Sequence, residues 1–193
     1  MNIQTKDETE KKPEIIVFAG PNGSGKSTFA GLFATLPSYI NADEIERSMH
    51  CSVMEAAQKA EELRESALNS NENFSFETVL STRRNLDLLK RAKQAGYFIR
   101  GYYILTSDPE INVIRVKSRQ ESGGHGVPRD KITERYYRAL KLIPEFVEVC
   151  DICHIYDNTD KPFRIFKKRK ENIFVWGNDY WDETKIKQLV GLT

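Results

Sequence analysis

Cysteine is scarce in this chain of 193 residues, which has only three. Such a small and odd number argues against a fold held together by disulfide bonds. Long apolar runs are missing too, since none approaches the roughly 20 residues that a membrane-spanning helix needs, and no membrane partner is expected. The chain also lacks an excess of charge of one sign, with 29 lysine and arginine residues against 28 aspartate and glutamate residues. This balance argues against generic binding of nucleic acid and leaves room only for a local basic patch.

Glycine and proline are infrequent, with 11 and 7 residues, while 39% of the chain is hydrophobic and 30% is charged. Disordered chains are poorer in large apolar residues and further from neutrality, so we expect a globular fold. We expect a flexible leader over residues 1–12 and a single domain over residues 13–193. Because the leader is polar and lacks the apolar core of a signal peptide, the expected location is the cytoplasm.

Short apolar runs alternate with helix-forming segments along most of the chain. The continuous apolar run over residues 14–19 suits a strand covered on both faces of a parallel sheet. Further strands are expected at residues 39–41, 74–81, 97–105, 152–156, 163–166 and 173–176. Helices are expected at residues 26–34, 43–49, 53–68, 85–95, 108–119 and 130–142, with a short helix closing the chain. This order predicts a three-layer α/β sandwich with a mainly parallel sheet.

A glycine-rich turn follows the first expected strand and matches the P-loop pattern GxxxxGK[ST] without departure: Gly20, Pro21, Asn22, Gly23, Ser24, Gly25, Lys26 and Ser27. The glycines let successive backbone N–H groups point at one anion, and the start of the next helix adds its dipole. In this pattern Lys26 reaches the β- and γ-phosphates of ATP, and the Ser27 hydroxyl coordinates Mg²⁺. Thr28 would face the phosphates from one residue further on. The expected cofactors are therefore ATP and Mg²⁺.

A P-loop alone does not separate kinases from GTPases, motors and transporter ATPases. The chain has no NKxD element, with which GTPases read their base. Residues 121–125 (ESGGH) resemble the signature loop of ABC ATPases, but that class also needs a later apolar strand that ends in Asp-Glu. The next apolar strand ends instead in Asp157-Asn158. We therefore favour a kinase.

Two carboxylates are candidates for a role in phosphoryl transfer, one after an expected strand and one within another. In an α/β sheet the carboxyl ends of the strands share the ligand-binding edge, so Asp43 would lie near the γ-phosphate. The alternative is that Asp43 only caps a helix that begins at Glu44. Glu77 interrupts an apolar strand, where a charge is costly without a partner, unless it faces outward from a half-exposed strand. Arg83, beyond the same strand, could hold an anionic acceptor or be a solvated loop charge.

Arginines flank a glycine-rich loop at residues 123–128. Their forked donors suit a lid, at about residues 115–140, that closes over phosphates and neutralises charge in the transition state. Arg135 and Arg138 are about one helical turn apart and can share a face with each other. Each arginine is on its own an ordinary surface group. Together on a P-loop chain they indicate at least one phosphate ligand.

Four stretches in this order resemble the zeta-toxin family of P-loop kinases, in particular a stand-alone bacterial branch often labelled as ABC-type ATPases. They are the P-loop region at residues 18–28, Ile40-Asn41-Ala42-Asp43, residues 76–81 (FETVLS), and residues 123–128 (GGHGVP) with Ile132, Arg135, Tyr136 and Arg138 after them. The resemblance runs from about residue 14 to residue 160. The P-loop is generic, whereas the Asn-x-Asp, Phe-Glu-Thr and Gly-Gly-His-x-Val-Pro elements are more specific.

Zeta toxins phosphorylate a sugar hydroxyl of UDP-N-acetylglucosamine with ATP. The resemblance implies that Asp43 is the catalytic base and that Glu77 binds the acceptor. It implies phosphate contacts for Arg119, Arg135 and Arg138, of which we expect Arg119 and Arg135 to be catalytic and Arg138 to bind substrate. Asp157-Asn158-Thr159 would lie near the adenine, or would form a simple Asx turn. This resemblance also suggests an antitoxin-like protein as a partner.

Two other functions stay open beside the kinase that acts on a small molecule. One is an ATP-binding switch regulated by a partner chain, and the other is a polynucleotide 5′-kinase. The stretch Cys150–His154 spells the CxxCH motif of haem attachment, but buried cysteines are the better interpretation. Residues 167–170 (KKRK) are expected to form a solvated hairpin tip, and Trp176, Tyr180 and Trp181 are expected to pack in the core.

Overall fold

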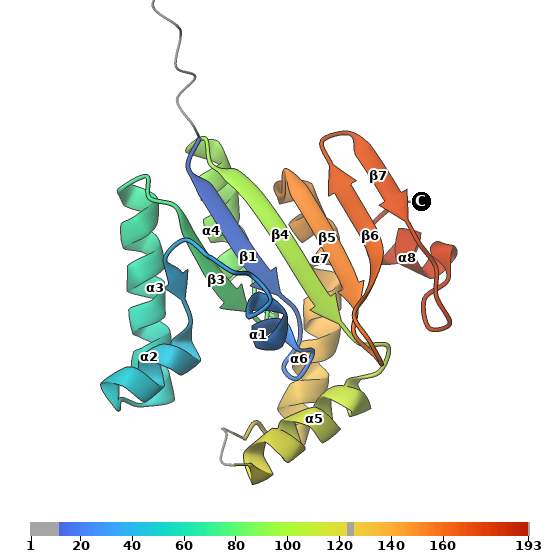
Figure 1. Cartoon of the computed structure of the whole chain (residues 1–193), viewed down its shortest axis with the longest axis horizontal. Coiled ribbons are helices and arrows are strands. Elements are labelled where there is room, and N and C mark those ends of the chain that lie inside the picture. Colours follow the sequence, from blue (N-terminus) through green and yellow to red (C-terminus); the bar gives the residue numbers. More distant parts are fainter. Residues whose placement is uncertain (1–11, 123–125, 193) are drawn as a thin grey trace, which may run out of the picture.

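The computed structural model describes residues 12–122 and 126–192, and its α/β fold confirms the predicted class (Figure 1). The described strands form one sheet in the order β2-β3-β1-β4-β5-β6-β7. Their bounds are β1 (Glu14–Ala19), β2 (Tyr39–Ile40), β3 (Phe74–Thr78), β4 (Phe98–Leu105), β5 (Ile152–Asp157), β6 (Phe163–Arg169) and β7 (Asn172–Val175). The strands from β2 to β5 pair in parallel, and β6 and β7 add an antiparallel edge.

The described helices are α1 (Lys26–Ala30), α2 (Ala42–Met49), α3 (Val53–Asn69), α4 (Arg84–Gln94), α5 (Pro109–Glu121), α6 (Arg129–Lys141), α7 (Ile143–Val149) and α8 (Glu183–Leu189). None of these helices has the length and apolar character that crossing a bilayer requires. The predicted leader at residues 1–11 and residues 123–125 of the glycine-rich loop lie outside the described residues.

Two predicted elements end earlier in the structure, and one helix was not predicted. The first helix ends at Ala30 rather than at residue 34, because the N–H groups of Leu32 and Phe33 bond to carbonyls three residues back and not four. The strand predicted to reach residue 81 stops at Thr78, and Leu80 takes a left-handed φ of 53° that a strand does not allow. Helix α7 was not predicted, and Pro144 lies in its first turn, where a proline is tolerated.

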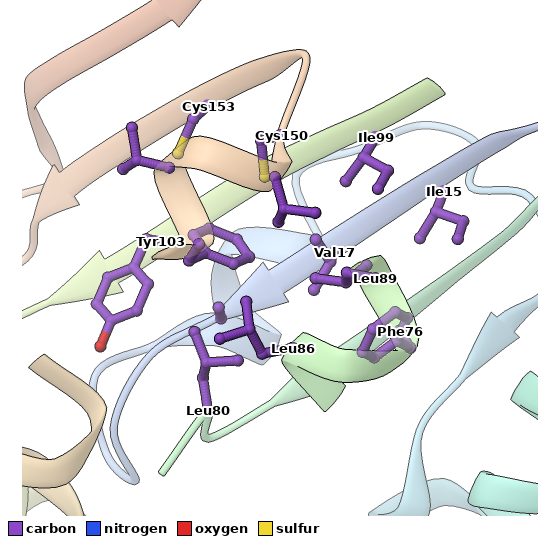
Figure 2. Packing of buried hydrophobic residues seen from close by; sticks show 14 of the residues in the cluster. Ile15, Val17, Phe76, Leu80, Leu86, Leu89, Ile99, Tyr103, Cys150 and Cys153 are labelled. Carbon is purple, nitrogen blue, oxygen red and sulfur yellow. The ribbon is translucent and has the colours of Figure 1, made fainter. Parts of the chain in front are cut away.

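The main hydrophobic core lies on one face of the sheet. Ile15, Val17 and Phe76 point from β1 and β3 toward Leu86 and Leu89 of α4 (Figure 2). Helices α3, α7 and α8 add buried apolar residues to the same cluster. Burial alternates along β5, where one side chain points into the core and the next is half-exposed, as expected for a strand with one covered face.

The opposite face of the sheet is covered by much less protein. Ile16 and Phe18 of β1 form a small cluster there with Ala30, against which Phe29 and Phe33 pack. Helix α1 is the only described helix on this face, and it lies in front of the central strands in Figure 1. The front layer is therefore built from α1 and its flanking loops.

Helices α5 and α6 pack against each other beyond the carboxyl ends of the strands (Figure 1). They cover most of the stretch expected to form a lid. The placement suits a lid, since the ligand edge of a parallel sheet is at these strand ends. Whether the pair opens and closes stays a prediction.

A close packing contact in the core gives a stability prediction. A Cβ atom added at Gly101 of β4 would lie 2.6 Å from the Sγ of Cys150 and 2.7 Å from the ring of Phe146, both buried. We expect Gly101→Val to lower the free energy of unfolding by about 1–3 kcal/mol in urea denaturation. Gly31→Ala is the control, because its φ of −64° suits alanine and its new Cβ would have no atom closer than 3.4 Å. Equal stability of the Gly101→Val protein and the wild type would contradict the packing.

Candidate active site

The P-loop connects β1 to α1 and has the backbone conformation of an anion-binding loop. Gly20, Gly23 and Gly25 all have positive φ angles, of 139°, 76° and 97°. At Gly20 a Cβ would lie 1.9 Å from the carbonyl oxygen of Ile104, so only glycine fits there. Helix α1 begins after Gly25 with no side-chain cap, which leaves its first N–H groups for another acceptor.

Two asparagines outside the loop hold it in place. The Nδ2 of Asn112, on α5, donates to the carbonyl of Asn22 over 2.6 Å, and the Nδ2 of Asn158 donates to the carbonyl of Ser24 over 2.8 Å. Within the loop the Oδ1 of Asn22 and the Oγ of Ser24 are buried without a hydrogen-bond partner among the described residues. Buried polar atoms are nearly always paired, so this loop is built around polar groups that a ligand can satisfy.

Lys26 lies within the curve of the loop, and its Nζ donates to the carbonyl of Pro21 over 2.9 Å. Burial of the ammonium lowers the pKa of Lys26 to about 8. The negative charges of Glu77 and Asp43 oppose this shift, and the positive charge of Arg119 adds to it. The loop lysine therefore sits among the predicted carboxylates and one predicted lid arginine.

Glu77 is the centre of a small hydrogen-bond network at the ends of β2 and β3. Its Oε2 accepts from the hydroxyl of Ser27 over 2.9 Å, and its Oε1 accepts from the hydroxyl of Tyr39. The Nδ2 of Asn41 donates to that hydroxyl over 3.1 Å and to Glu77 over 3.4 Å. Burial and the nearby carboxylate raise the pKa of Tyr39, which keeps its phenol protonated as a donor. Glu77 thus faces the P-loop and is not an outward-facing surface charge.

Asp43 is not the cap of helix α2. That role belongs to Asn41, whose Oδ1 accepts from the backbone N–H of Asp43 over 2.9 Å. The alternative explanation for Asp43 therefore fails, and its carboxylate lies in the first turn of α2, on the wall of a cavity.

Two cavities meet at the P-loop. The smaller, of about 270 Å³, is lined by loop and α5 residues: Gly23, Gly25, Lys26, Ser27, Thr28, Arg115, Val116 and Arg119. The larger, of about 810 Å³, includes Tyr39, Asn41, Asp43, Glu44 and Arg47 in its wall. Ser27 and Arg119 line both cavities, so a group bound in one is next to a group bound in the other.

The structure separates the predicted arginines. Arg119 lies on both cavities, whereas Arg135 and Arg138 line neither, and Arg138 forms a 3.3 Å ion pair with Glu134. Arg83 is also absent from the cavity walls, because its guanidinium makes two 2.7 Å hydrogen bonds to Glu145 of α7. The expectation that Arg83 binds the acceptor is therefore corrected. Helix α7, which the sequence did not reveal, supplies its partner.

The stretch after β5 forms the Asx turn that the sequence left open, since the N–H of Thr159 donates to the Oδ1 of Asp157 over 3.1 Å. The same turn also helps to position the P-loop. Arg115 donates to the carbonyls of Asn158 and Thr159 over 2.9 and 2.8 Å, so the turn links α5 to the P-loop.

Other sequence predictions have mixed outcomes. Cys150 and Cys153 are buried in the core, as predicted, and alternation along β5 sends His154 to the other face of the sheet. The basic run lies at the tip of the β6–β7 hairpin, as predicted, but Lys167 to Arg169 belong to β6 and only Lys170 is in the turn. The prediction of core packing was wrong for Trp176 and Tyr180. Both are exposed because they follow the edge strand β7.

Sequence reasoning missed Tyr39 and Asn112 as parts of the site. Tyr39 was seen only as the start of a strand, and the polar Asn112 on an amphipathic helix gave no pattern that distinguished it. Glu44 and Arg47 were missed for another reason. They lie one and four residues beyond Asp43 on α2, and only the position of that helix shows that they face the cavity.

Comparison with known proteins places this fold. No known protein-family profile matches the chain. The chain of the PezAT toxin–antitoxin system of Streptococcus pneumoniae superposes with a TM-score of 0.63 at 18% identity, over 98% of this chain and 87% of that one. A chain of the AvrRxo1-ORF1:ORF2 complex with ATP gives a TM-score of 0.70 at 12% identity, over 94% of this chain and 64% of that one. The chain therefore shares the fold of these two chains.

Two further comparisons differ in what they cover. A chain of the Pnkp1/Rnl/Hen1 RNA repair complex matches with a TM-score of 0.56 at 20% identity, and this chain spans only 47% of its length. In sequence, an uncharacterized protein of Haemophilus influenzae is 32% identical over 129 residues, which are 64% of this chain and 92% of that protein. The chain belongs to the same family as that protein.

The charges around Lys26 give a prediction about its ionisation. Because the carboxylate of Glu77 stabilises the ammonium, we expect Glu77→Gln to bring the pKa of Lys26 below about 8. Titration of ¹³C-labelled lysine side chains by NMR measures this value. Glu44→Gln is the control, since Glu44 lines the larger cavity but is not among the charges that act on Lys26. An unchanged or higher pKa in the Glu77→Gln protein would show that Glu77 does not face Lys26.

Proposed function

We propose that this protein is an ATP-dependent phosphotransferase of the zeta-toxin type, which moves the γ-phosphoryl group of ATP to a hydroxyl of a small molecule. The observation that carries the proposal is the pair of cavities that share Ser27 and Arg119. ATP phosphates occupy the smaller cavity along the P-loop, and the acceptor occupies the larger one. Phosphoryl transfer depends mainly on positioning and on neutralising charge, and this arrangement provides both.

The P-loop residues Gly20 to Thr28 bind the triphosphate. Lys26 reaches the terminal phosphates, and the partnerless polar atoms of Asn22 and Ser24 are satisfied when the loop is occupied. Mg²⁺ fits beside Ser27, because it prefers hydroxyl and carboxylate oxygens as ligands. Both kinds are present there, since the Oε2 of Glu77 is 2.9 Å from the Oγ of Ser27. When bound, Mg²⁺ neutralises charge on the phosphates.

Asp43 accepts the proton of the attacking hydroxyl. Its carboxylate lies on the acceptor cavity, and its charge is felt by Lys26, so it faces the end of the triphosphate. Glu77 stands between metal and acceptor, with one oxygen on Ser27 and the other on Tyr39. It orients the acceptor, and Arg119 stabilises the charge that develops on the transferred group.

The acceptor cavity of about 810 Å³ has the size of a small-molecule site. UDP-N-acetylglucosamine is the candidate acceptor because of the resemblance to zeta toxins. Arg47 and Arg119 in the wall provide charges that its diphosphate would need. The fold shared with a chain of a toxin–antitoxin system supports an antitoxin-like protein partner, and the expected location stays the cytoplasm.

Two alternatives predict different products. An ATP-binding switch that signals to a partner chain would bind ATP and phosphorylate no acceptor. A polynucleotide 5′-kinase, supported by the fold shared with a chain of an RNA repair complex, would label an oligonucleotide 5′-end. Incubation with labelled ATP, Mg²⁺ and a metabolite extract, UDP-N-acetylglucosamine or an oligonucleotide separates the three.

Asp43 provides the sharpest test of the transfer step. We expect Asp43→Asn to keep ATP affinity and to lower the rate of transfer about 10²- to 10⁴-fold, the usual contribution of a general base. Calorimetric titration with ATP and a labelled-phosphate assay measure the two quantities. Asp87→Asn removes the same charge from an exposed position on α4 and should change neither. Transfer at the wild-type rate by the Asp43→Asn protein would remove Asp43 from the mechanism.

The lid arginines give a second prediction. Because Arg119 lines both cavities, we expect Arg119→Ala to lower the rate of transfer about 100-fold. Arg135→Ala and Arg138→Ala in α6 should have smaller effects in the same assay, unless α6 moves over the phosphates when ATP binds. A larger loss from either α6 variant than from Arg119→Ala would show that the lid closes with α6 against the nucleotide.

A further inference from the structure

The sheet face opposite the main core is open over β4 to β7. On β5 and over the first six residues of β4, every second side chain is buried and the others are half-exposed, whereas Ile104 near the end of β4 is buried. The only described helix on this face, α1, has five residues and lies over the central strands (Figure 1). We call the remaining part, over β4 to β7, the open face.

Aromatic rings extend across the open face from Tyr102, whose own ring packs against Phe29 and Phe33 at the edge of α1. The strand registers place Tyr102 beside His154 and Lys167 beside Phe174 on the same side of the sheet. The rings of Tyr102 and His154 are nearly parallel, with 5.2 Å between centroids. Phe174 and Trp176 are also nearly parallel, at 5.9 Å, and are 46% and 36% exposed. Because these two exposed rings are adjacent, they form a contiguous apolar patch of the kind that marks an interaction surface.

Cations lie between and over these rings. The guanidinium of Arg164 is 5.0 Å from the centre of the Trp176 ring, and the ammonium of Lys167 is 5.7 Å from that of Phe174. A groove of about 560 Å³ at the same face continues the positive charge, with Lys12, Lys167, Arg169 and Lys170 in its wall.

Few carboxylates balance this charge. Of the nearby acids, Glu14 is engaged with Arg100 over 2.9 Å, and Asp151 is engaged with Lys93 and the N–H of Ile99. Burial, then the charges of Arg164, Lys167 and Arg100, lower the pKa of His154 to about 4. His154 is therefore an uncharged ring at neutral pH, set among cations.

We propose that the open face binds single-stranded nucleic acid, with bases stacked on the aromatic rings and phosphates along the basic groove. Every base has a flat face that stacks on an aromatic ring, and the backbone supplies one negative charge per nucleotide, which matches rings alternating with cations. A duplex fits less well because its bases are already stacked. A second copy of the chain fits less well because two positive faces repel each other. This proposal does not depend on phosphotransfer at the P-loop.

Binding is tested with the full chain and fluorescein-labelled oligouridine and oligothymidine of about 20 nucleotides, long enough for a site of this kind. We expect the fluorescence anisotropy to rise in about 50 mM salt, with Kd below about 100 μM. Phe174→Leu and Trp176→Ala should each weaken binding about 5- to 150-fold, since each removes a stacking ring. The double variant Lys167→Ala with Arg169→Ala should reduce the slope of log K against log salt by about 1.4, for two phosphate contacts.

Matched controls change the same residue types elsewhere. Tyr137→Ala removes a ring that is 53% exposed on α6, and Lys59→Ala removes an exposed charge on α3, and neither should affect binding. Lys26→Ala should also bind the oligonucleotides as the wild type does, so that a failure of the phosphotransferase proposal leaves this test intact. Circular dichroism verifies folding, and Trp176→Phe should restore most of the affinity lost in Trp176→Ala.

Four results would overturn the proposal. They are no binding by the wild type, wild-type affinity in both ring variants, equal affinity for a duplex of the same length, and a sedimenting dimer that Trp176→Ala dissociates. The last would assign the face to a second copy of the chain. A difference between the oligouridine and oligothymidine arms would identify RNA or DNA as the preferred strand.

Discussion

The arrangement of this site depends on one carboxylate in the interior of the sheet. Glu77 stands on β3, between β2 and β1, and is half-buried. A charge in that position is costly unless it has partners, and Ser27, Tyr39 and Asn41 provide hydrogen bonds to it. Each partner comes from a different segment, so satisfying one charge fixes the P-loop, β2 and the start of α2 relative to each other.

The parallel order of the sheet explains why so many polar groups meet at one edge. Strands β1, β2 and β3 end side by side. The P-loop follows β1, Asn41 and Asp43 follow β2, and Glu77 is the next-to-last residue of β3. On the far side of the loop, Asn112 and Asn158 clamp its backbone from α5 and from the end of β5. The P-loop is therefore positioned from both sides before any ligand binds, which reduces the entropy lost on binding.

The fold also leaves part of its sheet uncovered. Most helices gather on the core face, where β1, β4 and β5 present one continuous apolar surface. On β4 and β5 its residues at positions 99, 101, 153 and 155 alternate with half-exposed ones. Helix α1 is too short to cover the rest. Rings and cations therefore stay at the surface of β4 to β7. This face is positive, although the chain as a whole is almost neutral.

The sequence by itself determined the α/β class, most strands and helices, the P-loop, and Asp43 and Glu77 as candidates, because these follow from local periodicity and from a motif with contiguous residues. It did not reveal α7, because a helix of seven residues is too short for the helical spacing of Ile143, Phe146 and Val147 to stand out. Nor could it decide which arginine serves the site, as Arg83, Arg119, Arg135 and Arg138 are chemically alike. Only tertiary packing pairs Arg83 with Glu145 and places Arg119 on both cavities, because each contact joins segments that are far apart in the chain. The structure also shows that Asn41, and not Asp43, caps α2.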